Sequence, residues 1–600
     1  MKPIWNNIKT LDHNSNSKIY KIHSLKRLLT LTIPHFKKIG LAALCVLLVN
    51  AAELIKPYIL KLVIDDFLIN KAPQSMFYSI TSMGILYFLI VALGGMFSFS
   101  QVNFINSAAQ EIMKDLRTRV FNTIQLLPLS YLDKTSSGRL ITRATNDVAA
   151  LSEMYTDVII NLFKDVFLLI GIVYAMVMLD IKLALISISL VPIMFLFVFL
   201  LKNKIKNNFS KMKSLIGRIN GFMAENISGM KIIQIFRGEK EKKQEFLKLN
   251  GEYFKSTLFQ VRMNSILRPA SDVFQSISVA ILIWYAMGKI YNQTLEIGVL
   301  YAFTTYIKQF FNPISDLADN YTTIQSALVS ADRIFELLDE EDTLENLDLG
   351  RPMEYINGDI EFRNVWFSYN ETDWILKDVS FTIKRGETVA FVGETGAGKT
   401  TIISLISGFY PIQRGEILID GININEIKKK DLRRNVSVVL QDVFLFSGDI
   451  AKNISLNDNI DIEVINESLE ITCALEFVNN LPQGIYSPVM ERGSTFSAGE
   501  KQLLSFARAL AHKPSIFILD EATANIDTHT EKLIQQVIEK VSKHRTTLII
   551  AHRLSTIRNA DKIIVLSHGE IVEIGNHNEL IKGKGHYKSM IEGNSFKEVI

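Results

Sequence analysis

The sequence predicts an α-helical membrane domain followed by an α/β domain, and three observations support this order. Long uncharged runs fill roughly the first 320 residues, whereas the remainder alternates apolar and charged residues as soluble α/β domains do. The 48% hydrophobic fraction is high for a soluble protein, and the 36 Phe fit lipid contact. A chain of 600 residues is also too long for one hydrophobic core. We therefore expect two domains that face different solvents.

Charge and cysteine content narrow the possible functions. The formal net charge of +3 is too small to suggest a nucleic-acid partner. Cys45 and Cys473 lie in different halves and form neither a disulfide framework nor a metal-ligand spacing. We interpret both cysteines as packing residues, and we expect no nucleic acid.

The N-terminal residues 1–38 are expected to be a cytoplasmic segment at the membrane interface. They carry eight Lys/Arg against one acid, Asp12, and no apolar signal-peptide core precedes the first long hydrophobic run. Positive charge beside a span favours the cytoplasmic side.

The membrane domain is expected at residues 39–326, with six transmembrane helices. Runs of about 20 apolar residues can cross a bilayer. Hydropathy supports five such runs and permits a sixth, 297–307, which is the weakest. An even number of spans is required when the N-terminus and the C-terminal domain are both cytoplasmic. The five supported runs are 39–52, 72–110, 166–179, 183–201 and 273–288.

Two connections between these runs are long and helix-patterned, 111–155 and 202–260. Within the second, residues 202–255 contain 13 Lys/Arg against five Asp/Glu, as expected on the cytoplasmic side. The membrane helices should therefore continue well into the cytoplasm.

Three charged residues, Glu53, Lys56 and Lys61, interrupt the first apolar segment. Intramembrane charges often mark a transport pathway. The alternatives are that they reach the outer interface with their long side chains, or that they pair with each other at i,i+3.

A glycine-rich loop carries the main chemical signal of the second half. Residues 393–400 match G-x-x-x-x-G-K-[ST] between an apolar strand-like run and a helix-like stretch. In this context Lys399 reaches the β- and γ-phosphates, and the Thr400 hydroxyl binds Mg²⁺. The residues expected at the nucleotide are Gly393, Glu394, Thr395, Gly396, Ala397, Gly398, Lys399, Thr400 and Thr401.

An apolar run at 515–519 ends in two acids, Asp520 and Glu521. Asp520 suits the Mg²⁺ site, and Glu521 suits a general base that polarises the attacking water. Gln441 and His552 each follow a strand-like run and are expected to sense the γ-phosphate, with Gln441 also at the Mg²⁺.

Taken together, these segments resemble the ATP-binding-cassette (ABC) superfamily, specifically exporters with fused membrane and nucleotide domains. "GETGAGKT" is similar to Walker A, "VVLQD" to the Q-loop, "FSAGE" to the signature, "FILDEAT" to Walker B, "ANID" to the D-loop and "IIAHRLST" to the switch-histidine segment. "MERGS" and residues 127–151 are similar to the loops through which these exporters join their two domains. The resemblance covers nearly the whole chain.

The resemblance also implies further nucleotide contacts. Tyr369 of "VWFSY" stands where the family stacks an aromatic ring on adenine, and Asp527 closes the D-loop. In the family two cassettes pair head to tail, so Ser497 and Gly499 of the signature would serve ATP held by the other polypeptide. One membrane half and one cassette imply a half-transporter that dimerises in the lipid bilayer.

The signature departs from the family pattern Leu-Ser-Gly-Gly-Gln, because Ala498 and Glu500 replace a glycine and the glutamine. The Walker-side residues all match the family. An altered signature in a chain whose Walker residues match the family predicts a heterodimer. Its partner would carry a standard signature and lack the general-base Glu. The alternative is a homodimer in which the Glu500 side chain points to solvent.

The predicted function is ATP-driven, Mg²⁺-dependent export of an amphiphilic small molecule, lipid or peptide by alternating access. The alternative is an ATP-gated channel or regulatory subunit on the same scaffold. An acidic connector is expected at 327–356, the nucleotide-binding domain at 357–590 and a tail at 591–600. We expect an integral protein of a bacterial plasma membrane with a cytoplasmic cassette.

Overall fold

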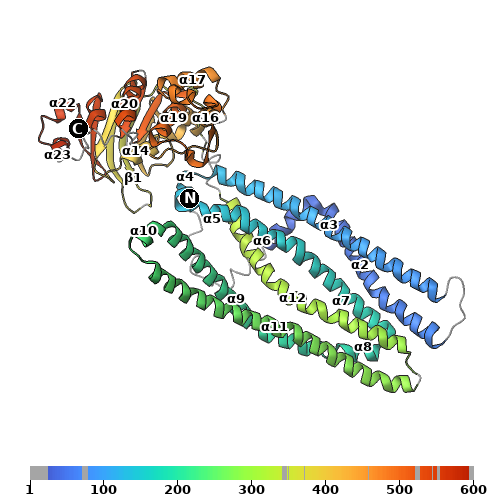
Figure 1. Cartoon of the computed structure of the whole chain (residues 1–600). Coiled ribbons are helices and arrows are strands. Elements are labelled where there is room, and N and C mark those ends of the chain that lie inside the picture. Colours follow the sequence, from blue (N-terminus) through green and yellow to red (C-terminus); the bar gives the residue numbers. More distant parts are fainter. Residues whose placement is uncertain are drawn as a thin grey trace. The chain divides into compact units, whose positions relative to one another are not determined.

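The computed structural model describes residues 24–70, 79–292, 294–340, 348, 350–370, 372–456, 458–520, 528–543, 545–550 and 554–592. Contacts divide the chain into two compact units (Figure 1). The helical unit comprises Met1–Gln125 and Ser137–Glu340, and the cassette unit comprises Leu126–Ser136 and Glu341–Ile600.

Long helices build the helical unit. It contains η2 (Ile33–His35), α2 (Phe36–Leu62), η3 (Val63–Ile69), α3 (Ile80–Leu126), α5 (Ser137–Thr142), η4 (Arg143–Asp147), α6 (Val148–Glu153), η5 (Met154–Val158), α7 (Ile159–Leu179), α8 (Ile181–Ile188), α9 (Val191–Ser228), α10 (Met230–Ile235), α11 (Glu239–Tyr291) and α12 (Ile297–Leu338). The elements η3, η4 and η5 are π-helical segments. As predicted, α3, α9 and α11 continue far beyond the length of a membrane span.

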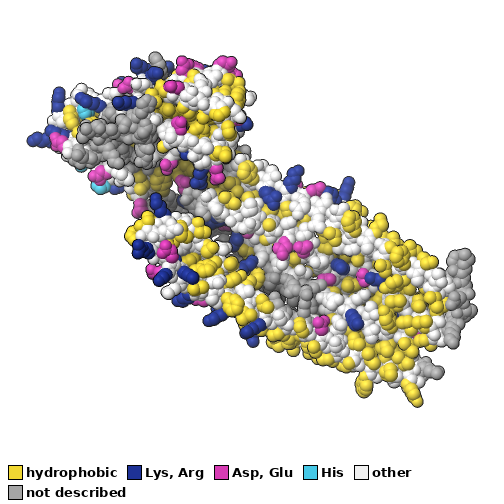
Figure 2. Space-filling model, viewed as in Figure 1, with side chains coloured by type: hydrophobic (Ala, Val, Ile, Leu, Met, Phe, Trp, Pro, Cys, Tyr) yellow, Lys and Arg dark blue, Asp and Glu magenta, His cyan; other side chains and the backbone are white. Residues whose placement is uncertain are grey.

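Among the described residues, five helical segments are long and apolar enough to cross a membrane. They are Ser24–Ile69, Ile80–Leu126, Ser137–Leu179, Ile181–Leu201 and Pro269–Tyr291. The visible face of the helical unit carries many hydrophobic side chains along these helices (Figure 2). The predicted sixth span at 297–307 lies in α12, which is not among the five, so the count of six stays a prediction.

The helix α12 forms one side of the buried core of the helical unit. Phe303, Tyr306 and Ile307 are at most 1% exposed and pack with Ile172 of α7 and Leu282 of α11. The spacing of the buried α12 residues matches one face of a helix. This apolar face is turned inward, which explains the weak hydropathy of the segment as a whole.

The C-terminal part of α12 differs from the prediction that a connector begins at residue 327. The helix runs to Leu338, and Ala327, Ala331, Ile334 and Leu337 on its inner face are fully buried. The apolar spacing continues past 327, and only after Asp339 does the segment lose it. Residues 327–338 therefore belong to the helical unit.

Glu53, Lys56 and Lys61 of α2 each lie in an ion pair. Lys56 lies 2.6 Å from Glu53, as the i,i+3 alternative predicted, and Lys61 lies 2.7 Å from Glu296. The buried carboxylate of Asp65, in η3, accepts a 2.6 Å hydrogen bond from the backbone N–H of Gly298 in the first turn of α12. A carboxylate at this position caps the helix and opposes its dipole.

The cassette unit contains a six-stranded sheet in the order β12-β11-β3-β10-β9-β6 and a four-stranded antiparallel sheet in the order β2-β1-β4-β5. The strands are β1 (Ile360–Phe367), β2 (Leu376–Ile383), β3 (Thr388–Gly393), β4 (Arg414–Ile419), β5 (Ile422–Asn423), β6 (Val436–Val439), β7 (Gly448–Asp449), β8 (Pro488–Val489), β9 (Ile516–Asp520), β10 (Thr546–Ile550), β11 (Lys562–Ser567) and β12 (Glu570–Gly575). The fully buried pattern of β9 and β10 is typical of central parallel strands.

Helices surround these sheets. They are α4 (Leu129–Lys134), α14 (Lys399–Ile406), α15 (Lys429–Asn435), α16 (Ile450–Ser455), α17 (Ile462–Ile471), α18 (Leu475–Asn479), α19 (Ala498–Ala511), α20 (Thr528–Ser542), α21 (Leu554–Arg558), α22 (His577–Leu580) and α23 (His586–Glu592). The short helix α4 groups with this unit although the sequence places it within the membrane domain, because its contacts are with the cassette. The other predicted domain boundaries stay predictions.

The close approach of η3 to α12 yields a first prediction. A Cβ atom at Gly298 would lie 2.5 Å from the Asp65 carboxylate and 2.5 Å from the Lys61 carbonyl. We expect Gly298→Ala to reduce stability by about 2 kcal/mol, as overpacking does, and to lower the Tm of the chain in nanodiscs.

The matched control is Gly288→Ala in α11, where no atom lies within 4 Å of the added methyl group. Its Tm should stay unchanged or rise slightly. Equal Tm values for the two alanine variants would contradict the steric account.

Candidate nucleotide site

Parallel strands bring the predicted site segments to one edge of the six-stranded sheet. The strands β3, β10, β9 and β6 run parallel, and Ile550 at the end of β10 pairs with both Phe391 and Asp520. Their carboxyl ends therefore lie side by side. The phosphate loop follows β3, Asp520 ends β9, and Gln441 follows β6. This edge is where open α/β sheets bind ligands.

The phosphate loop has the geometry that a triphosphate requires. The Lys399 side chain is buried and donates hydrogen bonds to the carbonyl oxygens of Gly393 (2.6 Å) and Glu394 (3.0 Å), which holds its ammonium within the loop. Gly396 has a φ of +86°, and a Cβ atom added there would meet no atom within 4 Å, so the loop is open at this residue. Helix α14 begins at Lys399 and directs its first N–H groups to the same space.

The remaining loop residues divide between the surface and the interior. Thr395 and Thr400 are exposed, whereas Ala397, Gly398 and Thr401 are buried beneath them. Exposed hydroxyl and amide groups above a buried lysine fit an anionic ligand.

Oxygen donors suited to Mg²⁺ lie on the same edge. The Asp520 carboxylate is 8% exposed at the end of β9, and the Thr400 hydroxyl and the Gln441 amide are exposed. Mg²⁺ prefers a few such oxygen ligands together with phosphate oxygens. In the described part of the chain, no group of three or more His, Cys, Asp or Glu forms a metal site by itself. A nucleotide-dependent Mg²⁺ fits this donor set.

Three predicted residues, Glu521, Asp527 and His552, lie outside the described residues. Glu521 follows Asp520 directly, and His552 is two residues past the end of β10. Their roles as general base, D-loop residue and γ-phosphate sensor stay predictions.

The predicted adenine-stacking residue, Tyr369, is held by neighbouring aromatic rings. Phe367 and Tyr410 meet its ring edge-on at centroid distances of 4.8 Å and 5.0 Å. The Tyr369 hydroxyl lies 3.3 Å from the Thr401 hydroxyl in the phosphate-loop helix. The ring is 42% exposed. One open aromatic face beside the phosphate loop suits a base.

Sequence reasoning missed Tyr410 and its partner Asp133. The Tyr410 hydroxyl donates a hydrogen bond to the Asp133 carboxylate of α4, the short helix that follows α3 in the chain. Burial and the adjacent Asp133 carboxylate raise the pKa of Tyr410. The aromatic brace of Tyr369 therefore touches a segment that enters from the membrane half. The only sequence signal was the family-like stretch 127–151, which does not name a partner.

In the signature turn, residues 496–500, a carboxylate accepts hydrogen bonds from donors of the same turn. The Glu500 carboxylate accepts hydrogen bonds from the backbone N–H of Ser497 (2.8 Å) and from its hydroxyl (2.9 Å). The Ser497 hydroxyl in turn accepts from the Glu500 N–H at 3.2 Å. This is a capping box at the start of α19. The carboxylate thus uses donors that an anion at this helix end would use.

Gly499 has a packing role in the same turn. It is buried, and a Cβ atom there would lie 2.5 Å from the Thr530 side chain of α20. Close approach of α19 and α20 therefore requires glycine at this position independently of any nucleotide.

A second missed element ties the Q-loop region to α19. Arg508 of α19 donates to the Phe444 carbonyl at 3.0 Å and to the Asn453 carbonyl at 2.7 Å. Asn453 exchanges two 2.8 Å hydrogen bonds with the backbone of Phe446. Burial lowers the pKa of Arg508. The segment after Gln441 is therefore fixed to the helix that carries the signature.

Comparisons with known proteins decide the family. The profile described as ABC transporter transmembrane region matches residues 39–314, and the profile described as ABC transporter matches residues 376–524. The chain is 42% identical to the probable multidrug resistance ABC transporter ATP-binding/permease protein YheH of Bacillus subtilis, over 84% of this chain and 76% of that protein. The chain belongs to the ABC transporter family.

Other ABC transporters match over nearly their whole length. The putative ABC transporter ATP-binding protein exp8 of Streptococcus pneumoniae is 37% identical, over 94% of this chain and 96% of that protein. The ATP-dependent lipid A-core flippase of Syntrophus aciditrophicus is 33% identical, over 94% and 93%. The predicted family, fold class and ATP-driven export activity are confirmed.

The family fixes the general role of the chain. It is an integral membrane protein that hydrolyses ATP and couples hydrolysis to export. With one membrane domain and one cassette it is a half-transporter, and such ABC half-transporters act as dimers in the bilayer.

The aromatic brace yields a second prediction. We expect Tyr369→Ala to weaken ATP binding about tenfold, because stacking on a base contributes roughly 1–3 kcal/mol. Tyr410→Ala should weaken binding by a smaller factor of about three, because it removes a ring that orients Tyr369. Titration with a fluorescent ATP analogue measures both.

Tyr410→Phe is the control, since it keeps the ring and removes only the hydroxyl that contacts Asp133. Its ATP affinity should stay within about twofold of wild type. A Tyr410→Ala variant that binds ATP as tightly as Tyr410→Phe would disprove the role of the Tyr410 ring in orienting Tyr369.

Proposed function

We propose that this chain is the catalytic half of a heterodimeric exporter that moves an amphiphilic small molecule, lipid or peptide across the plasma membrane. The cassette faces the cytoplasm and binds ATP with Mg²⁺. The relatives' names, which include multidrug resistance and a lipid flippase, support an amphiphilic cargo.

The Glu500–Ser497 contact is the observation that carries the heterodimer. In a composite site the signature offers the Ser497 hydroxyl and nearby N–H groups to the γ-phosphate of the opposite polypeptide. Here the Glu500 carboxylate accepts from the same hydroxyl and N–H. A carboxylate about 7 Å from one phosphate charge repels it by about 2 kcal/mol at an effective dielectric of about 20. The composite site built on this signature should bind ATP weakly.

The Walker side of this chain, which is its own set of phosphate-loop and Mg²⁺-binding residues, supports the opposite role, namely ATP hydrolysis. Lys399, Thr400, Gln441 and Asp520 meet at one sheet edge, and Glu521 and His552 complete the family set in the sequence. We propose that Glu521 polarises the attacking water, with His552 at the γ-phosphate. Paired with a standard signature from the partner, this side forms the site that hydrolyses ATP.

The homodimer is less well supported. It requires the Glu500 carboxylate to point to solvent, whereas the carboxylate turns back onto the Ser497 hydroxyl and N–H. In a homodimer both composite sites would carry this extra anion.

A protein partner is also supported by the tip of the α9–α11 hairpin. Ile232, Ile235 and Phe236, in and beside α10, are 63%, 65% and 79% exposed. Large apolar side chains gathered on such a tip are typical of a protein contact. In a transporter dimer the partner chain supplies the surface that covers them.

Restoring the signature tests the proposal. We expect the lone wild-type chain to show little ATPase activity in nanodiscs. The double variant Ala498→Gly/Glu500→Gln should raise this activity at least tenfold, because it removes about 2 kcal/mol of repulsion from both composite sites of a homodimer. Steady-state phosphate release measures the change.

Glu470→Gln is a matched control, because Glu470 is an exposed carboxylate in α17 of the same unit. It should leave the ATPase rate unchanged. Robust ATPase activity of the lone wild-type chain would contradict the heterodimer, and so would a double variant that behaves like the Glu470→Gln control.

A further inference from the structure

Three chain connections join the helical unit to the cassette unit. By the contact division they lie at residues 125–126, 136–137 and 340–341. The second connection leads into α5 and η4, and the third leaves the end of α12. These segments are the covalent routes by which movement of a cassette can reach the membrane helices. Contacts between them therefore decide whether the segments move separately or together.

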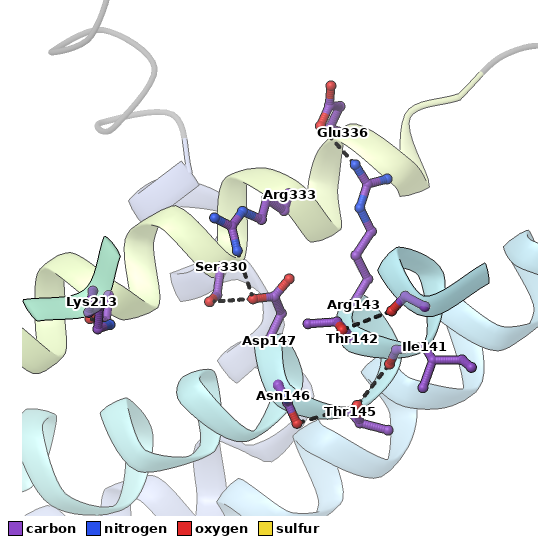
Figure 3. A network of polar contacts seen from close by, with 12 residues as sticks. Ile141, Thr142, Arg143, Thr145, Asn146, Asp147, Lys213, Ser330, Arg333 and Glu336 are labelled. Atoms are coloured by element: carbon purple, nitrogen blue, oxygen red, sulfur yellow. Dashed lines mark hydrogen bonds and ion pairs between the residues drawn. The ribbon is translucent and has the colours of Figure 1, made fainter. Parts of the chain in front are cut away.

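A buried carboxylate in η4 holds the end of α12. Asp147 is 5% exposed, and its Oδ1 atom accepts a 2.7 Å hydrogen bond from the Ser330 hydroxyl. The same oxygen lies 3.5 Å from the Arg333 guanidinium. Figure 3 shows Ser330 and Arg333 reaching this carboxylate from α12.

An arginine at the other end of η4 makes a second contact with α12. Arg143 is 8% exposed, and its guanidinium lies 3.2 Å from the Glu336 carboxylate (Figure 3). The wide turn of a π-helix places residues 143 and 147 on nearly the same face. Short π-helical segments inside α-helices often occur at functional sites.

The opposite side of the α12 end is held by N-terminal residues. Arg27 forms a bidentate pair with Asp339, and its guanidinium lies 4.2 Å from the centre of the Phe335 ring. Ser24 donates a hydrogen bond to Asp332. These contacts join the last turns of α12 to the N-terminal helical residues as well as to η4.

The burial of the charged side chains on η4 makes separation of η4 from α12 unfavourable. Removing one member of a buried or half-buried ion pair leaves the other charge desolvated without a partner, which is strongly unfavourable. Asp147 and Arg143 are mostly buried whereas Arg333 and Glu336 are mostly exposed, so separation of the two elements would take Arg333 away from the buried Asp147 carboxylate and Glu336 away from the buried Arg143 guanidinium. The segments therefore prefer to move as one body.

We propose that Asp147 and Arg143 are positioning residues of the transport cycle. They join the α5–η4 segment to the end of α12, so that two of the three connections to the cassette transmit its ATP-driven movement together to α7 and α12. Neither residue contacts nucleotide. This role is the same in a homodimer and in a heterodimer, so it does not rest on the partner proposed above.

The test compares ATP hydrolysis with movement of the membrane helices. The assembly that hydrolyses ATP is reconstituted in nanodiscs, with nitroxide labels at Leu68→Cys and Met178→Cys in a Cys45→Ala/Cys473→Ala background. Leu68 and Met178 are 63% and 67% exposed, in η3 and α7. Pulsed electron spin resonance then measures the distance shift on trapping with Mg-ATP and vanadate.

We expect Arg333→Gln and Asp147→Asn to reduce the shift to less than half of the wild-type value. The kcat and KM for ATP should stay within about threefold of wild type. Arg143→Glu should act similarly, and the charge-swapped Arg143→Glu/Glu336→Arg pair should recover part of the shift.

Lys242→Gln is the matched control for loss of a positive charge, because it breaks an exposed 3.0 Å pair within α11. It should keep the full shift. The proposal is overturned if Arg333→Gln and Asp147→Asn keep the full shift, if ATPase and shift are lost in parallel, or if wild type shows no nucleotide-dependent shift.

Discussion

The parallel pairing of β3, β10, β9 and β6 is the constraint on which the nucleotide site depends, because it alone brings together segments far apart in sequence. Phe391, Ile550 and Asp520 are in register across three strands. The chain turns that follow these strands therefore meet at one edge, where Lys399 supplies a buried positive charge and Asp520 a buried negative one. Any slip in this register would separate the phosphate loop from the Mg²⁺ donors, whatever the loop sequences were.

The signature turn obeys a different constraint, since in the proposed dimer it serves a nucleotide on another polypeptide. Its helix end offers a limited set of donors, and Glu500 already accepts from two of them. The contact stabilises α19 locally as a capping box, while it places an anion where a second anion would bind. Local stability and nucleotide binding are thus opposed in one turn. The proposed heterodimer resolves this conflict, because only one of its two composite sites carries the extra anion.

Local patterns predicted much of the fold and the segments that lie at the candidate site. The phosphate loop, the strand ending in Asp520 and the long extensions of the membrane helices each have a short-range sequence signal. Contacts between distant segments have no such sequence signal. The sequence therefore could not predict three pairs: Tyr410 with Asp133, Asp147 with Arg333, and Asp65 with Gly298. The end of α12 is an intermediate case. The buried residues Ala331, Ile334 and Leu337 are spaced as on a helix face, but the neighbouring acidic residues favoured a connector.

In the proposed dimer the two ATP sites are unequal, and the site that holds the phosphate loop of this chain hydrolyses ATP. Vanadate trapping of photoreactive azido-ATP in the assembled transporter, followed by separation of the two polypeptides, tests it most directly. In the proposed dimer the phosphate loop of each chain holds its own nucleotide, so the label reports which site turned over. We predict that trapped label is found almost entirely on this chain and is lost in its Glu521→Gln variant. Equal labelling of both polypeptides, or labelling of the partner alone, would show that hydrolysis is not confined to this chain's site.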